Sequence, residues 1–457
     1  MSPPPAPVRR LGMTELATRA AGGLRQRIAG EVVLPADETY DDHRNAFQHE
    51  GSPAVIVRAR THDDVRHAID LASEHDLVLS VRSGGHSLPG FGTNDGGVVL
   101  DLTLIDHVEV IDAARRIVRI GSGARWEDVA RELGPQGLAI SSGDTTKVGV
   151  GGLILGGGMG WMVRRYGLTI DALVAADVVT ADGRVLRASA EENPDLFWAL
   201  RGGGGNFGVV THFELVAQPV REVYAGSIVY PRADLAAALK GWRDVMRAAP
   251  DELTTMVGIL PEMLMPESFM IGVCVATGDA AAAEKIVEPL LGIAAVTAQT
   301  LTMKPYGDVL EEPPPPPPPG LSPVAANSLT ADLSDELIDL YAAGLAGDAP
   351  MVGQLRALGG AMSRVPTGDT AFAYRDSEAM LSAVLLSPAP EAHAAFGAFR
   401  TSLAPHTRGS YGNLMTSVDP DDVAALYPPE TYKRLVAIKG SYDPENVFRR
   451  NLNIPPT

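Results

Sequence analysis

The segment 80–90, SVRSGGHSLPG, constrains the fold more than any other part of the chain. It follows the apolar run 77–79, which predicts a short buried strand, and then turns sharply at its glycines. Glycines let backbone N–H groups approach a ligand closely, and successive N–H groups form a nest for anions such as pyrophosphate. His86 lies inside this turn. We therefore expect its ring beside whatever the nest holds.

The composition argues against several classes of partner. The chain has 457 residues and a formal net charge of −18. Phosphate backbones and anionic membranes both need clustered Lys and Arg, so neither is an expected partner. No run approaches the ~18 apolar residues of a membrane span, and no apolar stretch follows the basic residues near the start. We expect a cytoplasmic protein, and the sequence leaves both a monomer and a homodimer open.

The cysteine count excludes two kinds of cysteine-based site. The single cysteine, Cys274, rules out an internal disulfide and any cysteine-based metal cluster. It lies in the apolar run FMIGVCVATG, which indicates a small buried side chain. No metal site is expected.

The first half of the chain predicts strands connected by helices and glycine turns. Thr61 and Asp64 form the spacing of a capping box at the start of one helix, and 124–134 predicts another. A β-hairpin is expected at 172–189. Further strands are expected at 53–59, 77–82, 96–102, 107–112, 116–123 and 138–143.

Two further stretches of the chain are rich in glycine, and the sequence predicts a different structure for each. The segment 143–160 has too many glycines for an exposed helix and too many apolar residues for a solvated loop, so we expect it to be buried. Gly203, Gly205 and Gly208 have the spacing GxGxxG, but the helix is predicted before this turn and the strand after it. A nicotinamide site needs the opposite order, so we interpret the stretch as a turn with positive φ.

The region 222–405 is rich in alanine and alternates helical with strand-like runs. This pattern predicts an α+β unit in which helices cover one face of a sheet. Inside it, Glu311 and Glu312 precede seven prolines at 313–319. The run predicts polyproline II, either as a rigid surface loop or as a docking site for a proline-reading partner.

The C-terminal tail is dense in asparagine where a chain end would ordinarily fray. Asn446, Asn451 and Asn453 lie within the last residues. Buried amide side chains would explain such density, because each amide both donates and accepts hydrogen bonds. We expect the tail to return to the first unit and to close a site there.

Five motifs in a fixed order resemble the FAD-linked oxidases of the vanillyl-alcohol oxidase superfamily, and within it the berberine bridge enzyme-like group. They are RSGGHS, VGVGGLILGGGMG, DVVTADGRVL, DLFWALRGGGGNFGVVT, and YGNL with YDPENVFRRNLNIPP. The resemblance covers about 38–220 and 405–457. It implies an α+β fold, in which a two-part FAD-binding domain carries an inserted substrate domain, with an antiparallel sheet covered by helices. The implied parts are an N-terminal extension, 1–37, the FAD-binding parts 38–220 and 405–457, and a substrate domain, 221–404.

The resemblance implies that FAD is attached covalently. His86 would carry the flavin through its 8α-methyl group, and the backbone of 83–87 would hold the pyrophosphate. Many relatives add a second link from a cysteine in a GxCxxVG pattern, where this chain has Thr145. We therefore expect the His86 link alone. The implied cofactor-binding residues are Arg82, Ser83, Gly84, Gly85, His86, Ser87, Gly143, Asp144, Lys147, Val148, Gly149, Gly152, Leu153, Val209, Val210, Tyr411, Asn413 and Asn451.

The cofactor defines the expected chemistry. Flavin accepts a hydride from a carbon that bears oxygen or nitrogen, and the protein positions the substrate and accepts a proton. Val148 matches the small residue that admits dioxygen in relatives, which favours an oxidase that produces hydrogen peroxide. Leu153 replaces a histidine found in some relatives. The alternatives are a dehydrogenase that uses another electron acceptor, and a flavoprotein that binds a small molecule without turnover.

Proton acceptance has two candidates. Tyr411 in the segment YGNL would act as general base if its pKa were lowered. Tyr374 is the second candidate. The acid that relatives carry on the substrate sheet falls here near Leu381 or Ser382, and neither side chain is a credible base. The substrate is expected to be a small metabolite.

Overall fold

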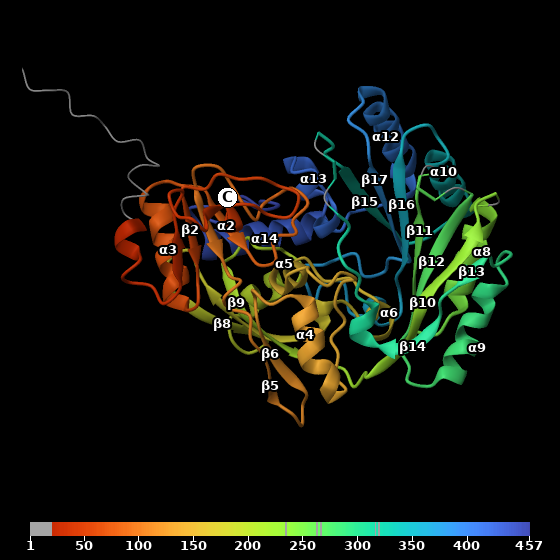
Figure 1. Ribbon diagram of the computed structural model, residues 1–457, viewed down its shortest axis with the longest axis horizontal. Coiled ribbons are helices and arrows are strands. Elements are labelled where there is room, and N and C mark those ends of the chain that lie inside the picture. The colour runs from red at the N-terminus through yellow and green to blue at the C-terminus, as the bar shows by residue number, and fades with distance from the viewer. Residues whose placement is uncertain (1–20, 234, 262–263, 266, 316, 319) are drawn as a thin grey trace, which may run out of the picture.

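The computed structural model describes residues 21–457 except 234, 262–263, 266, 316 and 319. Within this described part, the strands form three sheets and helices pack against them, as Figure 1 shows. The predicted α+β class is confirmed, and most strand pairs are antiparallel. No helix among the described residues is both long and apolar enough to cross a membrane.

The first sheet has four strands in the order β1-β2-β4-β3, and β2, β4 and β3 are parallel. Its strands are β1 (Glu31–Val33), β2 (Val55–Arg58), β3 (Leu79–Arg82) and β4 (Val98–Asp101). Helix α3 (His62–Glu74) packs against it and begins with the predicted capping box of Thr61 and Asp64. Although β1 precedes the expected boundary at residue 38, it pairs with β2 and belongs to this sheet.

The second sheet has five antiparallel strands in the order β5-β6-β9-β7-β8. They are β5 (Val108–Asp112), β6 (Ile117–Gly121), β7 (Leu173–Val179), β8 (Val185–Ser189) and β9 (Val209–Val216). The predicted hairpin is the β7–β8 pair. The strand expected at 138–143 is wrong, because only Ala139 pairs, in one bridge to Gln218. Polar groups of that stretch bond to side chains instead: the Thr169 hydroxyl donates to Ser141 O, and Ser142 N–H donates to the Tyr306 hydroxyl oxygen.

The largest sheet has eight strands, seven of them in the order β13-β10-β12-β11-β16-β17-β15, with β14 paired to β10. These strands are β10 (Glu222–Pro231), β11 (Leu253–Ile259), β12 (Ser268–Val275), β13 (Ala298–Gln299), β14 (Thr302–Pro305), β15 (Val324–Thr330), β16 (Met351–Ala357) and β17 (Ala379–Leu385). One apolar core joins this sheet to four helices, so the helices cover one face, as expected. They are α8 (Leu235–Ala248), α9 (Ala280–Leu291), α10 (Asp335–Leu345) and α12 (Pro390–Leu403). Cys274 lies buried in β12, and burial raises the pKa of its thiol to about 12.

The remaining helices are short, except the helix of the tail, α14. The α-helices are α2 (Tyr40–His43), α4 (Trp126–Leu133), α5 (Val150–Leu155), α6 (Val163–Tyr166), α7 (Pro194–Leu200), α11 (Ala361–Arg364), α13 (Pro420–Ala424) and α14 (Pro429–Tyr442). The 3₁₀ helices are η1 (Gly134–Gln136), η2 (Thr169–Asp171), η3 (Tyr306–Val309), η4 (Ala404–His406) and η5 (Gly412–Leu414). Helix α5 lies within the glycine-rich segment 143–160 and is largely buried, as predicted.

The C-terminal tail returns to the first half of the chain, as predicted. Figure 1 shows α14 among the elements of that half. The backbone N–H of Ile454 donates to Asn206 Oδ1 over 3.0 Å, and Asn206 Nδ2 donates to Leu452 O over 3.1 Å. The Lys439 ammonium donates to Asn206 O over 2.8 Å. The buried Asn206 therefore holds the tail against the glycine turn that precedes β9.

Candidate active site

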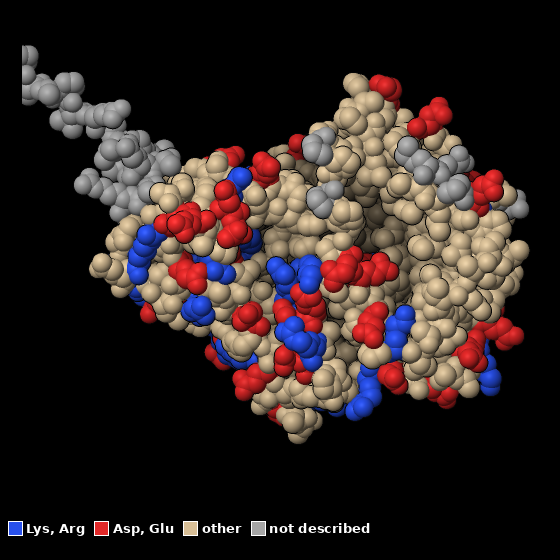
Figure 2. All heavy atoms as spheres, in the orientation of Figure 1, with Lys and Arg blue, Asp and Glu red and all other residues tan. Residues whose placement is uncertain are grey.

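A cavity of about 1090 Å³ is lined by residues from all three sheets and from the tail. Figure 2 shows the molecule hollowed between its two halves. Small-molecule sites usually measure ~300–1,000 Å³, so this cavity has room for a dinucleotide cofactor together with a small substrate.

The structure brings most of the predicted site residues together on the cavity wall. These are Arg82, Ser83, Gly84, Gly85, His86, Ser87, Gly143, Asp144, Val148, Gly149, Gly152, Leu153, Val209, Val210, Tyr411, Asn413 and Asn451. Thr145 lies there too.

Two predicted residues are not among those that line the cavity. Lys147 points away, because its ammonium pairs with the Glu127 carboxylate at 2.6 Å. The Tyr374 hydroxyl donates to Ala425 O over 3.2 Å, and its ring packs against Gly409. The expectation that Tyr374 belongs to the pocket is therefore corrected.

The two glycine-rich segments touch through their backbones at the cavity. A Cβ added to Gly84 would lie 2.3 Å from Gly149 N, and one added to Gly149 would lie 2.1 Å from Gly84 N. Neither position therefore accepts a side chain. The Ser83 hydroxyl also accepts the N–H of Gly151 over 3.2 Å. Glycine at both positions lets two backbone segments and a ligand share one narrow space.

His86 lies on the cavity wall with its ring stacked on Phe47, at 4.4 Å between ring centroids and 15° between planes. Partial burial lowers the pKa of the imidazole, and the nearby Arg125 lowers it further. Neutral imidazole is therefore favoured, and its unprotonated nitrogen keeps a lone pair. That form is the nucleophile a covalent link requires.

The GxGxxG turn has the positive φ that the sequence predicted, with φ of 73° at Gly204 and 156° at Gly208. The turn also lines the cavity, whereas the sequence predicted a turn without a role in the site. The tail closes over it, where Asn451 Nδ2 donates to Gly205 O over 3.0 Å. The glycines thus bring backbone to the site without forming a nicotinamide motif.

Tyr411 is fixed in place by hydrogen bonds. Its hydroxyl oxygen accepts from Gly158 N–H over 3.2 Å and from Asn413 Nδ2 over 3.0 Å. Burial raises the pKa of this phenol, although those hydrogen bonds oppose the rise. The phenol therefore stays protonated at neutral pH, which does not favour Tyr411 as a general base.

Four charged residues of the cavity wall are absent from the predicted site, namely Glu311, Glu312, Arg356 and Arg450, and two of them lie next to Asp144. Arg356, on β16, is buried and pairs with the Asp144 carboxylate. Glu311 precedes the proline run and lies beside Asp144. Neither belongs to a motif: Arg356 lies in an ordinary alternating strand, and Glu311 precedes a stretch that predicts only a surface loop.

The cavity fits FAD in three respects. Backbone N–H groups of the glycine turns suit a pyrophosphate. The neutral His86 suits attachment. Asn451 Oδ1 is buried and has no hydrogen-bond partner among the described residues, so it is available to a ligand N–H or O–H.

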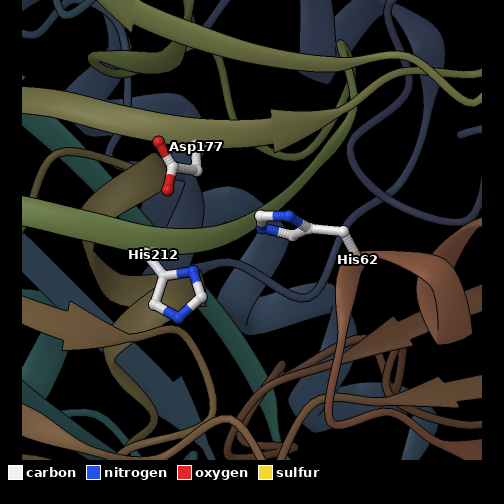
Figure 3. A group of neighbouring side chains, drawn as sticks. All are labelled: His62, Asp177 and His212. Atoms are coloured by element: carbon white, nitrogen blue, oxygen red, sulfur yellow. The ribbon is translucent and has the colours of Figure 1, made fainter. Parts of the chain in front are cut away.

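A second group of chemically capable side chains lies outside this cavity. His62, Asp177 and His212 point toward one another (Figure 3), with one potential ligand atom from each within 4.8 Å of the others. However, ring nitrogens of both histidines contact the Thr211 hydroxyl, at 2.9 and 3.1 Å, and Arg119 pairs with Asp177. These donors are engaged within the protein, so we interpret the group as a hydrogen-bonded network that ties α3 to β7 and β9.

Comparison with known proteins identifies two family models in the chain. The model described as FAD binding domain matches residues 53–189. The model described as berberine and berberine like matches residues 410–455. The first match includes the two glycine-rich loops and the second includes the asparagine-rich tail.

Curated relatives match over nearly the whole chain. (R)-6-hydroxynicotine oxidase of Paenarthrobacter nicotinovorans is 33% identical over 464 residues, which cover 94% of this chain and 97% of the relative. Glucooligosaccharide oxidase of Sarocladium strictum is 31% identical over 444 residues, which cover 88% and 87%.

Solved structures agree with the sequence matches. The crystal structure of 6-hydroxy-D-nicotine oxidase from Arthrobacter nicotinovorans has a TM-score of 0.82 and 30% identity, and covers 94% of this chain and 98% of its own. A glucooligosaccharide oxidase from Acremonium strictum has a TM-score of 0.83 and 26% identity, over 98% and 100%. Its FAD is described as 6-S-cysteinyl, 8α-N1-histidyl.

Proposed function

Since the chain belongs to the berberine bridge enzyme-like family of FAD-linked oxidases, we propose that it oxidises a C–OH or C–N bond of a small metabolite and reduces dioxygen to hydrogen peroxide. The observation that carries this proposal is His86, stacked on Phe47 on the wall of a cavity built from both glycine-rich loops and the tail. When bound, FAD accepts the substrate hydride and passes the electrons on.

The chain's own residues divide the remaining tasks. His86 attaches the cofactor, and the N–H groups around Gly84 and Gly85 hold the pyrophosphate. Asn451 offers to the cofactor its buried side-chain oxygen, which has no hydrogen-bond partner in the described part of the chain. Tyr411 and Asn413, bonded to each other, form the wall beside β15 of the large sheet, where Asn327 Nδ2 donates to Tyr411 O over 2.9 Å.

We propose a single covalent link. Thr145 stands where doubly linked relatives have a cysteine, and a threonine hydroxyl does not form that bond. Thr145 is among the residues that line the cavity, and its hydroxyl donates to Asp144 Oδ1 over 3.2 Å, which supports this proposal. The relative with 6-S-cysteinyl and 8α-histidyl links is the natural comparison.

We propose that 38–220 and 405–457 form the FAD-binding domain and 221–404 the substrate domain. The apolar core of the large sheet and its helices supports this division, because all its members lie within 221–404. A second core joins the second sheet to the tail and also takes in residues of 221–404 such as Phe372 and Met380, where the two parts meet. Strand β1 lies before residue 38 but pairs with β2 of the FAD-binding part.

The test is turnover of the purified flavoprotein against a panel of amines and oligosaccharides that includes 6-hydroxynicotine and glucooligosaccharides, after which two relatives are named. Oxygen consumed and peroxide released are measured together. The proposal predicts equal amounts of both with at least one class. Turnover that needs an artificial acceptor and ignores dioxygen would indicate a dehydrogenase instead. No flavin reduction by any compound, under anaerobic mixing, would favour a ligand-binding flavoprotein.

A further inference from the structure

The site lacks a proton acceptor among the residues expected from its relatives. The Tyr411 hydroxyl is engaged and its pKa is raised, and Tyr374 lies outside the cavity. Leu381 packs in the apolar core on the helix side of the large sheet, and Ser382 is not part of the cavity wall. We propose that Glu311 is the general base, a role that rests on the function proposed above.

The backbone of Glu311 is fixed against the cofactor loop. Its N–H donates to Asp144 O over 2.8 Å, and its C=O accepts from Thr146 N–H over 2.9 Å. Glu311 therefore pairs like a parallel strand with Thr145. Relatives bond flavin position 6 from the place of Thr145, and position 6 adjoins the hydride-accepting N5 of the ring system. Glu311 thus borders the part of the cavity where the reacting carbon is expected.

The described prolines that follow restrict φ along this segment. Pro313, Pro314 and Pro315 line the cavity directly after Glu311 and Glu312. Proline fixes φ and loses little conformational entropy on folding, so a proline run holds its position without internal hydrogen bonds. The expected surface loop is therefore also part of the cavity wall.

Glu311 is the free carboxylate among its neighbours. Asp144 pairs with Arg356, and Glu312 accepts from the Thr146 hydroxyl over 3.1 Å. The Glu311 carboxylate has no hydrogen-bond or ion-pair partner among the described residues. Partial burial raises its pKa, and repulsion from Asp144 raises it further. A carboxylate with a raised pKa is a stronger base, which suits proton transfer.

The reaction balances with this assignment. The substrate C–H bond breaks and its hydride, with two electrons, reduces the bound FAD. The proton of the substrate O–H or N–H passes to the Glu311 carboxylate, and C=O or C=N forms. Dioxygen takes up the two electrons and two protons as hydrogen peroxide, and Glu311 returns its proton in that half of the cycle.

The test compares Glu311→Gln with Glu311→Asp and with Asp308→Asn. Asp308 is exposed on the same segment and is not among the cavity-lining residues, so its variant removes an equal charge without touching the site. In the holoenzyme, Glu311→Gln is expected to lose ~10²–10⁴-fold in kcat/KM and to abolish the fall in rate at acid pH. Glu311→Asp should recover part of the rate, and Asp308→Asn should match the wild type.

A second measurement does not depend on turnover. A carboxyl whose folded pKa is raised binds its proton more tightly when folded, so its contribution to stability is lost as the pH rises through that pKa. Glu311→Gln should therefore raise Tm relative to the wild type at pH 7 more than at pH 4. Wild-type rate and pH profile in Glu311→Gln, or a Tm lowered at both pH values, would overturn the role. Inactive wild type would instead refute the proposed function.

Discussion

The suitability of His86 for attachment comes from its neighbours as much as from its place in a glycine turn. Its ring stacks on Phe47 and has a lowered pKa because of burial and Arg125. The sequence predicts where this histidine lies but not that it is neutral, because Phe47 and Arg125 are distant in sequence and belong to no motif. Protonation state is therefore a property of the fold.

Thr145 offers a direct test of the single link. We expect His86→Ala with Thr145→Cys to retain flavin through acid precipitation, because a cysteine thiolate is a better nucleophile than a hydroxyl. His86→Ala alone should lose it. Thr146→Cys is the matched control, because the Thr146 hydroxyl is exposed and bonds to Glu312. Flavin fluorescence on the denatured chain is the measurement. Flavin lost from the double variant would place Thr145 away from the flavin.

Single residues were predictable where backbone geometry constrains the residue type. Gly84 and Gly149 are required because any Cβ there meets backbone, and such a requirement leaves a mark on the sequence. Arg356 leaves none, since a charged side chain in a strand has many possible partners. Asn206 lies in a recognised motif, but the motif does not indicate that its side chain holds the tail. Lys147 illustrates the converse: it lies in the right motif, but its side chain pairs with a glutamate outside the cavity.

At the scale of elements, α14 brings the tail to the site through a buried ion pair. Lys439 and Asp443 are both fully buried and lie 2.6 Å apart. The Lys439 ammonium also donates to Asn206 O and Phe448 O, at 2.8 and 3.0 Å. The sequence predicted the return of the tail from its asparagines. It could not predict this pair, because an i,i+4 Lys–Asp spacing is equally common on exposed helices.

Lys439→Met is expected to lower the free energy of unfolding by ~3–5 kcal/mol, because it leaves the Asp443 carboxylate buried without its cation. The change is measured by chemical denaturation. Lys433→Met, on the exposed side of the same helix, is the control and should have little effect. Equal loss in both variants would mean that α14 is sensitive to any substitution and that the buried pair is not responsible.

The network around His212 predicts a pH dependence of stability. Burial, with Arg119 and His107, lowers the pKa of His212 to about 4, against 6.5 for the free side chain. The unfolded chain therefore binds this proton more readily, and stability is lost as pH falls from about 6.5 toward 4. His212→Asn should reduce the fall in Tm between pH 7 and pH 5. His393→Asn, at an exposed position, should leave that fall unchanged, and an unchanged fall in His212→Asn would contradict the account.

In the molecule as a whole, the segments on the cofactor side of the cavity differ in sequence type from those on the substrate side. The cofactor side depends on glycine loops with strict backbone requirements, so its motifs and the fold class were predictable. The large sheet presents ordinary alternating strands to the cavity, through residues such as Met256, Gln354 and Val384. Many side chains satisfy such positions, so the sequence does not specify the substrate.

Attachment of the flavin to His86 can be measured by acid precipitation of the purified protein. The protein is denatured in acid and pelleted, and flavin fluorescence is measured in the pellet and in the supernatant for the wild type and for His86→Ala. If His86 carries the flavin, we expect flavin in the wild-type pellet, in stoichiometric amount, and none in the pellet of the variant. Flavin released into the wild-type supernatant, or retained by His86→Ala, would contradict attachment through His86.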